Sequence, residues 1–333
     1  MTGIRDVADR AGVSVATVSR ALRDLPRVSD STRQRVRAAA DELGYVASAS
    51  ASGLASGRTM TIGLVVPFVT RWFFSTLITG AESVLNPRGY DLLLYELGGR
   101  IEARDRFFAQ HLSRKRVDGL LVLSLRLAPS EEERLHRTGL PVVLVGSATP
   151  GFDSVGIDDI DAARVATELL LSLGHRRIAF VGGPDDDTVS ATPMHRRAGY
   201  RLALMEADLP WDLSLDVNGD FTVAGGTRAA RQLLSVPRPP TAIVAASDEM
   251  AMGCLHAARL EGVAVPQCLS VVGIDDHELA EVMDLTTVAQ PVLEQGRIAA
   301  ELLLARLDGA RPDSEPWVLR TELVPRGSTA PPP

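Results

Sequence analysis

The feature that most constrains this chain is a regular alternation of short apolar runs with amphipathic helical stretches, beginning near residue 60. Continuous apolar strands separated by helices indicate a parallel sheet covered by helices on both faces. Because about 270 residues exceed the usual size of one domain, two lobes fit this pattern better than one large sheet. Seven runs carry the strand signal: 61–66, 91–95, 119–123, 142–145, 178–181, 242–245 and 270–273.

Residues 4–44 follow a different pattern, that of three short helices. Apolar residues recur at helical spacing from Ile4 onward, and Gly12 ends the first helix. Ser14 is a suitable N-cap for a second helix that reaches about residue 23, and Ser29 for a third that ends at Gly44. A bundle of about 40 residues is only marginally stable alone, so we expect DNA, a partner or the neighbouring domain to stabilise it.

The first two of these helices match a helix-turn-helix. Ala8, Val13 and Val18 can pack where the helices cross, and the small residues Ala8 and Gly12 allow the backbones to approach closely. In this motif the second helix lies in the major groove of DNA and presents its N-terminal side chains to the base edges. A generic helical hairpin that does not bind DNA is the alternative.

The candidate DNA-binding residues lie on that second helix. Val15 and Ala16 suit apolar contacts, such as with a thymine methyl group, and Arg20 can donate two hydrogen bonds to a guanine. In the alternative interpretation, the helix is only capped by its first serine, and Arg20 stays in water. Short hydroxyl donors suit phosphates, which position a helix without specifying sequence, and the segment carries three of them: Ser14, Thr17 and Ser19.

Charge and composition also set the first 60 residues apart. They carry nine arginines against six acids, whereas the rest of the chain carries 26 basic and 36 acidic residues. A basic head on an acidic body suits a head that binds a polyanion, although an ordinary arginine-bearing helical domain has the same composition. Residues 46–58 are low-complexity Ala, Ser and Gly, typical of a linker, with Leu54 as their one large apolar side chain.

Several classes of protein are excluded by what the sequence lacks. No basic segment followed by an apolar run opens the chain, and no stretch approaches the ~18 apolar residues of a membrane span, so we expect a cytoplasmic protein with no membrane partner. The two cysteines, Cys254 and Cys268, cannot form a disulfide framework and show no metal-ligand spacing. The acidic run at 185–187 is typical of a solvated loop, so we expect no metal and no cofactor.

Catalytic motifs are missing as well. The chain has no Gly-x-Ser-x-Gly elbow, no phosphate-binding Gly-x-x-x-x-Gly-Lys loop and no His-Glu-x-x-His zinc motif. We therefore expect the protein not to be an enzyme. The alternative hypothesis is an α/β enzyme that acts on sugars or nucleotides and carries a helical head that does not bind DNA.

Several sequence blocks, in order along the chain, resemble those of the LacI/GalR family of transcriptional repressors. They are residues 4–45 with the segment Val15-Ala16-Thr17-Val18-Ser19-Arg20, then Gly174-His175-Arg176-Arg177-Ile178, and then 247–253, 271–276 and 285–291. The resemblance implies an all-α helix-turn-helix head joined to an α/β two-lobed body, like a type I periplasmic binding protein, with parallel sheets. It places the head at 1–45, the hinge or linker at 46–59 and the effector-binding and dimerisation domain at 60–333. One lobe would comprise about 60–158 and 289–317, and the other about 159–288 and 318–328.

The resemblance also implies a function. Such a protein is a DNA-binding transcriptional regulator, expected here to be a repressor, that binds a pseudo-palindromic operator as a homodimer, with a tetramer possible. A small effector, expected to be a sugar or a glycoside, binds between the lobes and switches it. Leu54 falls at the position where family members insert a leucine into the minor groove from a hinge helix. The preceding Gly53 departs from the family pattern and disfavours a helix there by about 1 kcal/mol relative to Ala.

The resemblance places the effector-binding residues in the body. Arg196, three residues before Gly199, matches the ligand-binding arginine of the family, and Asp275 matches the ligand-binding aspartate. A structural ion pair is the alternative role for Arg196 and Asp275. Core packing is the alternative role for Phe73 and Phe74. Phe68 and Gly146 replace polar residues of sugar-specific members, which favours a larger or less polar ligand. The remaining candidates match stacking or polar positions of the family: Phe73, Phe74, Phe221 and Ser247.

Overall fold

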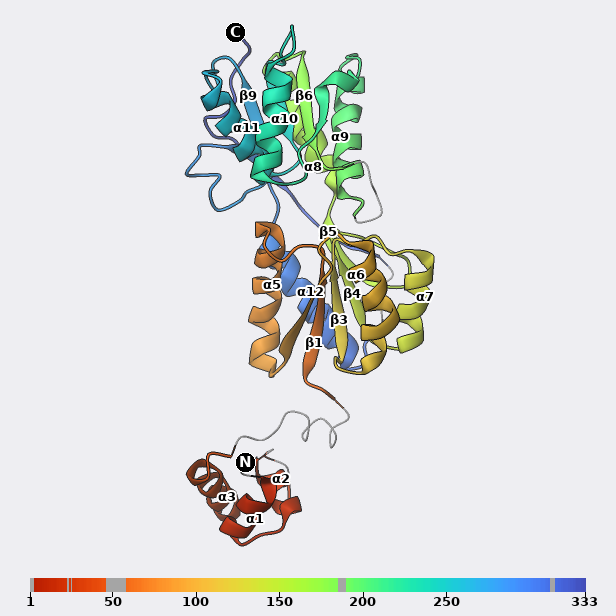
Figure 1. The fold of residues 1–333 in the computed structure, drawn as a ribbon, viewed down its shortest axis with the longest axis vertical. Helices are drawn as coiled ribbons and strands as arrows, with labels where there is room; N and C mark the ends of the chain where they lie inside the picture. Colours follow the sequence, from red (N-terminus) through yellow and green to blue (C-terminus); the bar gives the residue numbers. More distant parts are fainter. Residues whose placement is uncertain (1–2, 23, 25, 46–57, 185–189, 312–314) are drawn as a thin grey trace. The chain divides into compact units, whose positions relative to one another are not determined.

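A computed structural model describes residues 3–22, 24, 26–45, 58–184, 190–311 and 315–333. The chain forms two compact units, Met1–Met60 and Thr61–Pro333. In its described residues the first unit has helices and no strand, and the second contains two sheets with their covering helices (Figure 1). The all-α head and the α/β body with parallel sheets, which the sequence predicted, are confirmed.

The head consists of α1 (Ile4–Ala11), α2 (Val15–Leu22) and α3 (Asp30–Glu42). Gly12 ends α1 in the left-handed region with φ of 65°, which glycine adopts at low cost. Ser14 Oγ accepts a hydrogen bond from the backbone N–H of Thr17 at 3.2 Å, and Ser29 Oγ accepts one from Thr32 at 3.3 Å. The predicted stop and both predicted N-caps are therefore present in the structure.

A small apolar core holds the three helices of the head together. Val18 of α2 is fully buried between residues of α1 and α3, and Val13 packs against the same core from the turn. Small side chains dominate, which lets short helices cross closely. The buried members are Val7, Ala8, Ala11, Val18, Ala21, Val36, Ala39 and Ala40.

The body alternates strands and helices along its whole length. Its strands are β1 (Thr61–Val66), β2 (Asp91–Glu96), β3 (Gly119–Leu123), β4 (Val142–Val145), β5 (Asp153–Ile157), β6 (Ile178–Gly182), β7 (Asp216–Asn218), β8 (Ala242–Ala245), β9 (Ser270–Asp275), β10 (Thr286–Ala289), β11 (Trp317–Leu319) and β12 (Glu322–Val324). Its α-helices are α5 (Trp72–Leu85), α6 (Ile101–Arg106), α7 (Pro129–Thr138), α8 (Asp159–Ser172), α9 (Thr192–Glu206), α10 (Val223–Leu234), α11 (Asp248–Leu260) and α12 (Val292–Leu307).

These strands form two six-stranded sheets. The first has the order β11-β5-β4-β3-β1-β2 and the second the order β12-β10-β9-β8-β6-β7. All neighbours are parallel except β10 and β12. In each sheet the strand order reverses direction, between β1 and β3 and between β6 and β8. In open α/β sheets, ligands bind at the carboxyl ends of the strands at such a reversal.

We call the first sheet with α5, α6, α7 and α12 the first lobe, and the second sheet with α8, α9, α10 and α11 the second lobe (Figure 1). The chain crosses between them three times. It leaves the first lobe after β5, returns after β10 and leaves again between β11 and β12. The last crossing follows residue 319, two residues beyond the boundary expected near 317.

Glycines permit the closest helix contacts in the body. A Cβ atom on Gly226 of α10 would lie 2.2 Å from the carbonyl oxygen of Met250 in α11, and one on Gly253 would lie 2.2 Å from that of Val223. The two backbones therefore touch directly at two points. Rigid packing of this kind fixes the first turn of α11, which lies at the site described below.

Some parts of the chain that the sequence singles out lie outside the described residues. They are Leu54, most of the linker at 46–59 and the acidic run at 185–187. Within the described ranges, no helix is both long and apolar enough to cross a membrane, and no cluster of His, Cys, Asp and Glu side chains has the arrangement of a metal site.

Candidate functional site

Helix α2 turns two distinct faces to its surroundings. Val18 and Ala21 are fully buried in the core of the head, whereas Ala16 and Arg20 are exposed. Val15, at the start of the helix, is 40% exposed. The spacing of three residues between the buried positions directs the others outward. The side chains predicted to contact bases therefore all lie on the accessible face of α2.

The hydroxyl groups predicted to contact phosphates differ from one another. Ser14 Oγ caps α2 and also shares a hydrogen bond of 2.9 Å with Thr17 Oγ1. Ser14 is exposed, while Thr17 and Ser19 are half-buried. Capping uses the acceptor capacity of Ser14, and because only one hydroxyl of the Ser14–Thr17 pair donates to the other, the second keeps its hydrogen available to donate.

The body contains a cavity of about 370 Å³ at the carboxyl ends of the strands of both sheets. Pro67 follows β1 and Ser124 follows β3 in the first lobe, while Ser247 follows β8 and Asp275 ends β9 in the second. All six predicted effector-binding side chains line this cavity: Phe73, Phe74, Arg196, Phe221, Ser247 and Asp275. Such a volume is typical of a small-molecule site.

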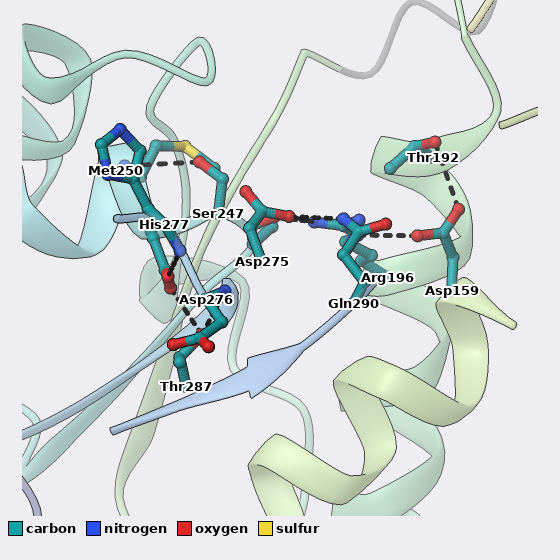
Figure 2. A network of polar contacts seen from close by, with 12 residues as sticks. Asp159, Thr192, Arg196, Ser247, Met250, Asp275, Asp276, His277, Thr287 and Gln290 are labelled. Carbon is teal, nitrogen blue, oxygen red and sulfur yellow. Dashed lines mark hydrogen bonds and ion pairs between the residues drawn. The ribbon is translucent and has the colours of Figure 1, made fainter. Parts of the chain in front are cut away.

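Arg196 is the best-connected polar side chain of the cleft. Its Nε donates to Asp159 Oδ1 at 2.8 Å, and its terminal nitrogen donates to Asp275 Oδ1 at 3.3 Å and to the carbonyl oxygen of Ala246 (Figure 2). Burial alone would lower the pKa of Arg196, but the two carboxylates more than offset that effect and raise its pKa. The guanidinium is therefore charged, and three oxygens fix its orientation.

A close helix contact positions this arginine. A Cβ atom on Gly199, one turn after Arg196 in α9, would lie 2.0 Å from the carbonyl oxygen of Ile160 in α8. The missing side chain lets α9 approach the first turn of α8, where Asp159 accepts from Arg196. Thr192 Oγ1 also donates to Asp159, at 3.2 Å, from the start of α9. The spacing from arginine to glycine thus has a direct structural reason.

Asp275 is held by a strained turn at the end of β9. Asp275 and Asp276 have φ of 137° and 55°, which side-chain-bearing residues rarely adopt and which surrounding contacts must therefore stabilise. Asp248 supplies one such contact, because its Oδ2 accepts from the backbone N–H of His277 at 2.8 Å. A Cβ atom on Gly273 would lie 2.0 Å from Asp248 Oδ1, so a glycine in β9 leaves room for this carboxylate.

The aromatic residues of the cleft come from both lobes. The rings of Phe73 and Phe74 meet edge to face at 5.3 Å, and Phe74 is buried while lining the cavity. Phe221 has a positive φ of 52°. Its ring occupies the space beside Gly183, where a Cβ atom would lie only 2.3 Å from the ring. Gly183 therefore sets the position of this ring, which sequence reasoning did not foresee.

Other lining residues were also missed. Gln290 follows β10, donates to Asp275 Oδ1 at 2.6 Å and accepts from Gln295 at 2.9 Å. Asp159 follows β5, a strand that the apolar pattern did not reveal. Arg71 of the first lobe and Glu249 of the second also line the cavity. The position of Gln290 directly after a strand could have indicated it, since β9 and β10 end at the same edge.

The comparisons with known proteins cover both units. A model of bacterial regulatory proteins of the lacI family matches residues 3–48, and a model of a periplasmic binding protein-like domain matches residues 167–329. The HTH-type transcriptional repressor CytR of Escherichia coli strain K12 is 36% identical over 330 residues, which cover 98% of this chain and 96% of that protein.

Two solved structures extend the similarity to three dimensions. The Lac repressor dimer bound to operator and the anti-inducer ONPF is 28% identical, with a TM-score of 0.87 and 99% of each chain covered. A complex of the transcriptional regulator CelR with cellobiose is 34% identical, with a TM-score of 0.72, and covers 98% of this chain and 100% of that one. The similarity thus spans the head and the body together.

Proposed function

Because the chain belongs to the lacI family of bacterial regulatory proteins, and is a DNA-binding transcriptional repressor rather than an enzyme, we propose that it represses transcription from a pseudo-palindromic operator. In this proposal two copies of the chain bind the operator in the cytoplasm, and a small effector in the cleft controls their affinity. The effector belongs to the sugars or glycosides.

The observation that carries the proposal is the division of α2 into two faces. Val18 and Ala21 hold the helix in the core of the head, while Val15, Ala16 and Arg20 are accessible together. A helix anchored in this way can enter the major groove without unfolding the head. Arg20 then donates to a guanine, and Val15 and Ala16 contact neighbouring bases. The hydroxyl groups of Ser14, Thr17 and Ser19 contact phosphates.

A dimer follows from the form of the operator. A single helix reads only a few base pairs, whereas two copies related by a two-fold axis read two half-sites about one helical turn apart. The Lac repressor structure is a dimer bound to operator, which supports this arrangement. Leu54, outside the described residues, is proposed to enter the minor groove between the half-sites.

The cleft is proposed as the effector site because its polar groups are already oriented. Arg196 can donate and Asp275 can accept from hydroxyl groups, while the rings of Phe73 and Phe221 can stack on the apolar face of a sugar. The solved complex of CelR with cellobiose supports a carbohydrate. A ligand that touches residues of both lobes stabilises the arrangement of the lobes that it fits best, and so shifts the operator-binding equilibrium.

Operator binding and its response to effector test the proposal. The full-length protein is used to protect DNA fragments from its own genomic neighbourhood, and sugars are then titrated against the protected fragment. We expect a protected site with two-fold symmetry, and at least one sugar that changes the affinity at least about tenfold, which corresponds to about 1.4 kcal/mol of coupling. Protection of all fragments alike, or an affinity that no sugar changes, would contradict it.

A further inference from the structure

The charges that line the cleft do not balance. Among the described residues, four carboxylates line it, those of Asp159, Asp220, Glu249 and Asp275, against the two guanidinium groups of Arg71 and Arg196. One of those cations is shared, because Arg196 lies between Asp159 and Asp275. The cleft therefore carries more negative than positive charge.

Asp220 has an ion-pair partner of its own outside the cavity, although its charge, like that of Glu249, also acts on Arg71. Its Oδ2 accepts from Arg228 at 2.7 Å, and Arg228 is exposed and does not line the cavity. Once the paired groups are set aside, Glu249 of the second lobe and Arg71 of the first lobe remain. Whether these two neutralise each other decides what the cleft can bind.

Arg71 and Glu249 do not form an ion pair in this structure. The guanidinium carbon of Arg71 lies 4.1 Å from the ring centroid of Phe68, so this cation stacks on an aromatic face. Within the described part of the chain, Glu249 accepts no hydrogen bond, although it is half-buried in the wall of the cleft. Its oxygens are not among the buried atoms without a partner in the described residues, so they are open to the cavity and can accept a hydrogen bond from a ligand.

Two carboxyl groups in this wall of the cleft have raised pKa values, mainly because they are buried and secondly because Asp275 lies nearby. Burial and the nearby charge of Asp275 raise the pKa of Glu249 to about 7, although Arg71 acts in the opposite direction. Burial and Asp275 also raise the pKa of Asp248, one residue earlier, to about 7. Near neutral pH this wall of the cleft therefore takes up protons readily.

The aromatic lining adds a second attraction for positive charge. The rings of Phe68, Phe73, Phe74 and Phe221 all line the cavity. Aromatic faces attract cations and also stack on the C–H face of a sugar ring. An effector that carries hydroxyl groups and one cationic nitrogen matches all of these features. A phosphorylated or carboxylated sugar would meet the excess carboxylates and be repelled.

We propose that the effector of this cleft is a carbohydrate with a protonated amine, that its ammonium group binds Glu249, and that anionic sugars are excluded. This inference rests on the proposed role of the cleft as the effector site. Arg196 and Asp275 bind the hydroxyl groups in this arrangement, and the amine distinguishes the effector from the corresponding neutral sugar.

The test compares matched pairs of sugars that differ only at one carbon. Binding of D-glucosamine and D-glucose, D-galactosamine and D-galactose, and D-mannosamine and D-mannose to the full-length protein is measured by calorimetry near pH 7 and constant ionic strength. Because a charge-assisted hydrogen bond is about twice as strong as a neutral one, we expect at least one amino sugar to bind about tenfold or more tightly than its parent. Glucose 6-phosphate should not bind.

Two variants test whether Glu249 causes the preference for an amino sugar over its parent sugar. Glu249→Gln keeps the size of the side chain but removes its charge, and should bring the amino sugar to within about threefold of its parent. Glu261→Gln is the matched control, since Glu261 follows the far end of the same helix, pairs with Arg231 at the surface and does not line the cavity. It should leave the preference unchanged.

The outcomes separate this inference from the proposed function. Equal binding within every pair, no binding of any amino sugar, or a preference that survives in Glu249→Gln would overturn the inference. A neutral sugar that changes operator affinity would still support the proposed function in that case. An amino sugar that binds through Glu249 but leaves operator affinity unchanged would support the inference and contradict the switch.

Discussion

The recognition face of α2 and the cleft of the body use arginine in opposite ways. Arg20 is exposed on a helix that is held by its apolar face alone, whereas Arg196 is 4% exposed and bound to three oxygens. DNA presents a dense array of hydrogen-bond acceptors, so a side chain that contacts the bases can stay hydrated until the DNA binds. A small ligand offers few contacts, and the protein must therefore hold its polar groups in place beforehand.

This difference predicts which substitutions destabilise the fold and which affect binding alone. Arg196 in the cleft serves folding and binding together, because its partners are two carboxylates that are largely withdrawn from water. Residues on the exposed face of α2 serve binding only.

The largest effect is expected from Arg196→Ala. Removing this side chain leaves the side chains of Asp159 and Asp275, which are 10% and 9% exposed, without their cation, and breaking an ion pair so largely withdrawn from water costs about 3–5 kcal/mol of folding free energy. Guanidinium unfolding followed by tryptophan fluorescence measures the change, because all three tryptophans lie beyond residue 60. Ligand binding should be lost as well.

Arg164→Ala is the control for that experiment. Arg164 also bonds two carboxylates, Asp161 and Glu168, but all three side chains are substantially exposed. Exposed pairs contribute at most about 1 kcal/mol. If the two variants lost the same stability, the buried network would not be the source of the effect, and the contrast with α2 would lose its basis.

The next effect tests why α9 carries a glycine after Arg196. Helix propensity alone predicts that Gly199→Ala stabilises the protein by about 0.5–1 kcal/mol. The contact with Ile160 predicts the opposite sign, since an added Cβ would lie 2.0 Å from a backbone oxygen. We expect a loss of about 1–3 kcal/mol by denaturant unfolding.

Ala198→Gly provides the propensity baseline in the same helix, at an exposed position. It should cost about 0.5–1 kcal/mol. Should Gly199→Ala be neutral or stabilising, the close approach of α8 and α9 would not be needed to position Arg196.

Much of this arrangement was predictable from the sequence, and the misses have physical causes. The strands β1, β3, β4 and β8 have the predicted bounds because they are buried on both faces and thus uniformly apolar. The strand β5 contains Asp153 and Gly156 within five residues, so no apolar run marks it. Missing β5 concealed Asp159, because its role depends on lying just beyond that strand.

Glu249 was missed for a different reason. An acidic residue in the first turn of a helix is favoured by the helix dipole alone, so its presence there carries no functional signal. Only the position of that helix at the wall of the cavity gives the side chain a role. Sequence periodicity identifies elements and their buried faces. Which surfaces of the two lobes face each other depends on three chain crossings, and no local pattern specifies those.

On the DNA side, Arg20→Ala should weaken operator binding by about 1–3 kcal/mol and relax the preference at one base pair in each half-site. The stability of the head should change by less than about 0.5 kcal/mol, because the side chain is exposed. Equilibrium binding to single-base operator variants at fixed salt separates a lost base contact from a general loss.

Arg20→Lys sharpens this test. Lysine keeps the charge but lacks the planar fork, so a base contact predicts that the preference is still lost. A phosphate contact predicts that lysine restores binding to all sequences equally. A uniform loss in Arg20→Ala together with full rescue by lysine would assign Arg20 to the backbone of the DNA rather than to a base.

The smallest predicted effect is a dependence of folding stability on pH, which comes from a residue of the cleft and not from α2. The pKa of Glu249 lies at about 7 in the folded protein, above its ordinary value of 4.5. A carboxyl whose pKa is raised on folding binds its proton more tightly in the folded state, so stability falls as pH rises from about 4.5 to about 7. Glu249→Gln cannot lose a proton and should escape this fall, becoming more stable than the wild type by about 1 kcal/mol near pH 8, or roughly 2–4 °C in Tm.

The advantage of Glu249→Gln should vanish near pH 5, where the carboxyl of the wild type is protonated in the folded state. Glu261→Gln should show no such trend, and an advantage of Glu249→Gln that is the same at both pH values would mean that Glu249 is charged throughout and already neutralised by the protein.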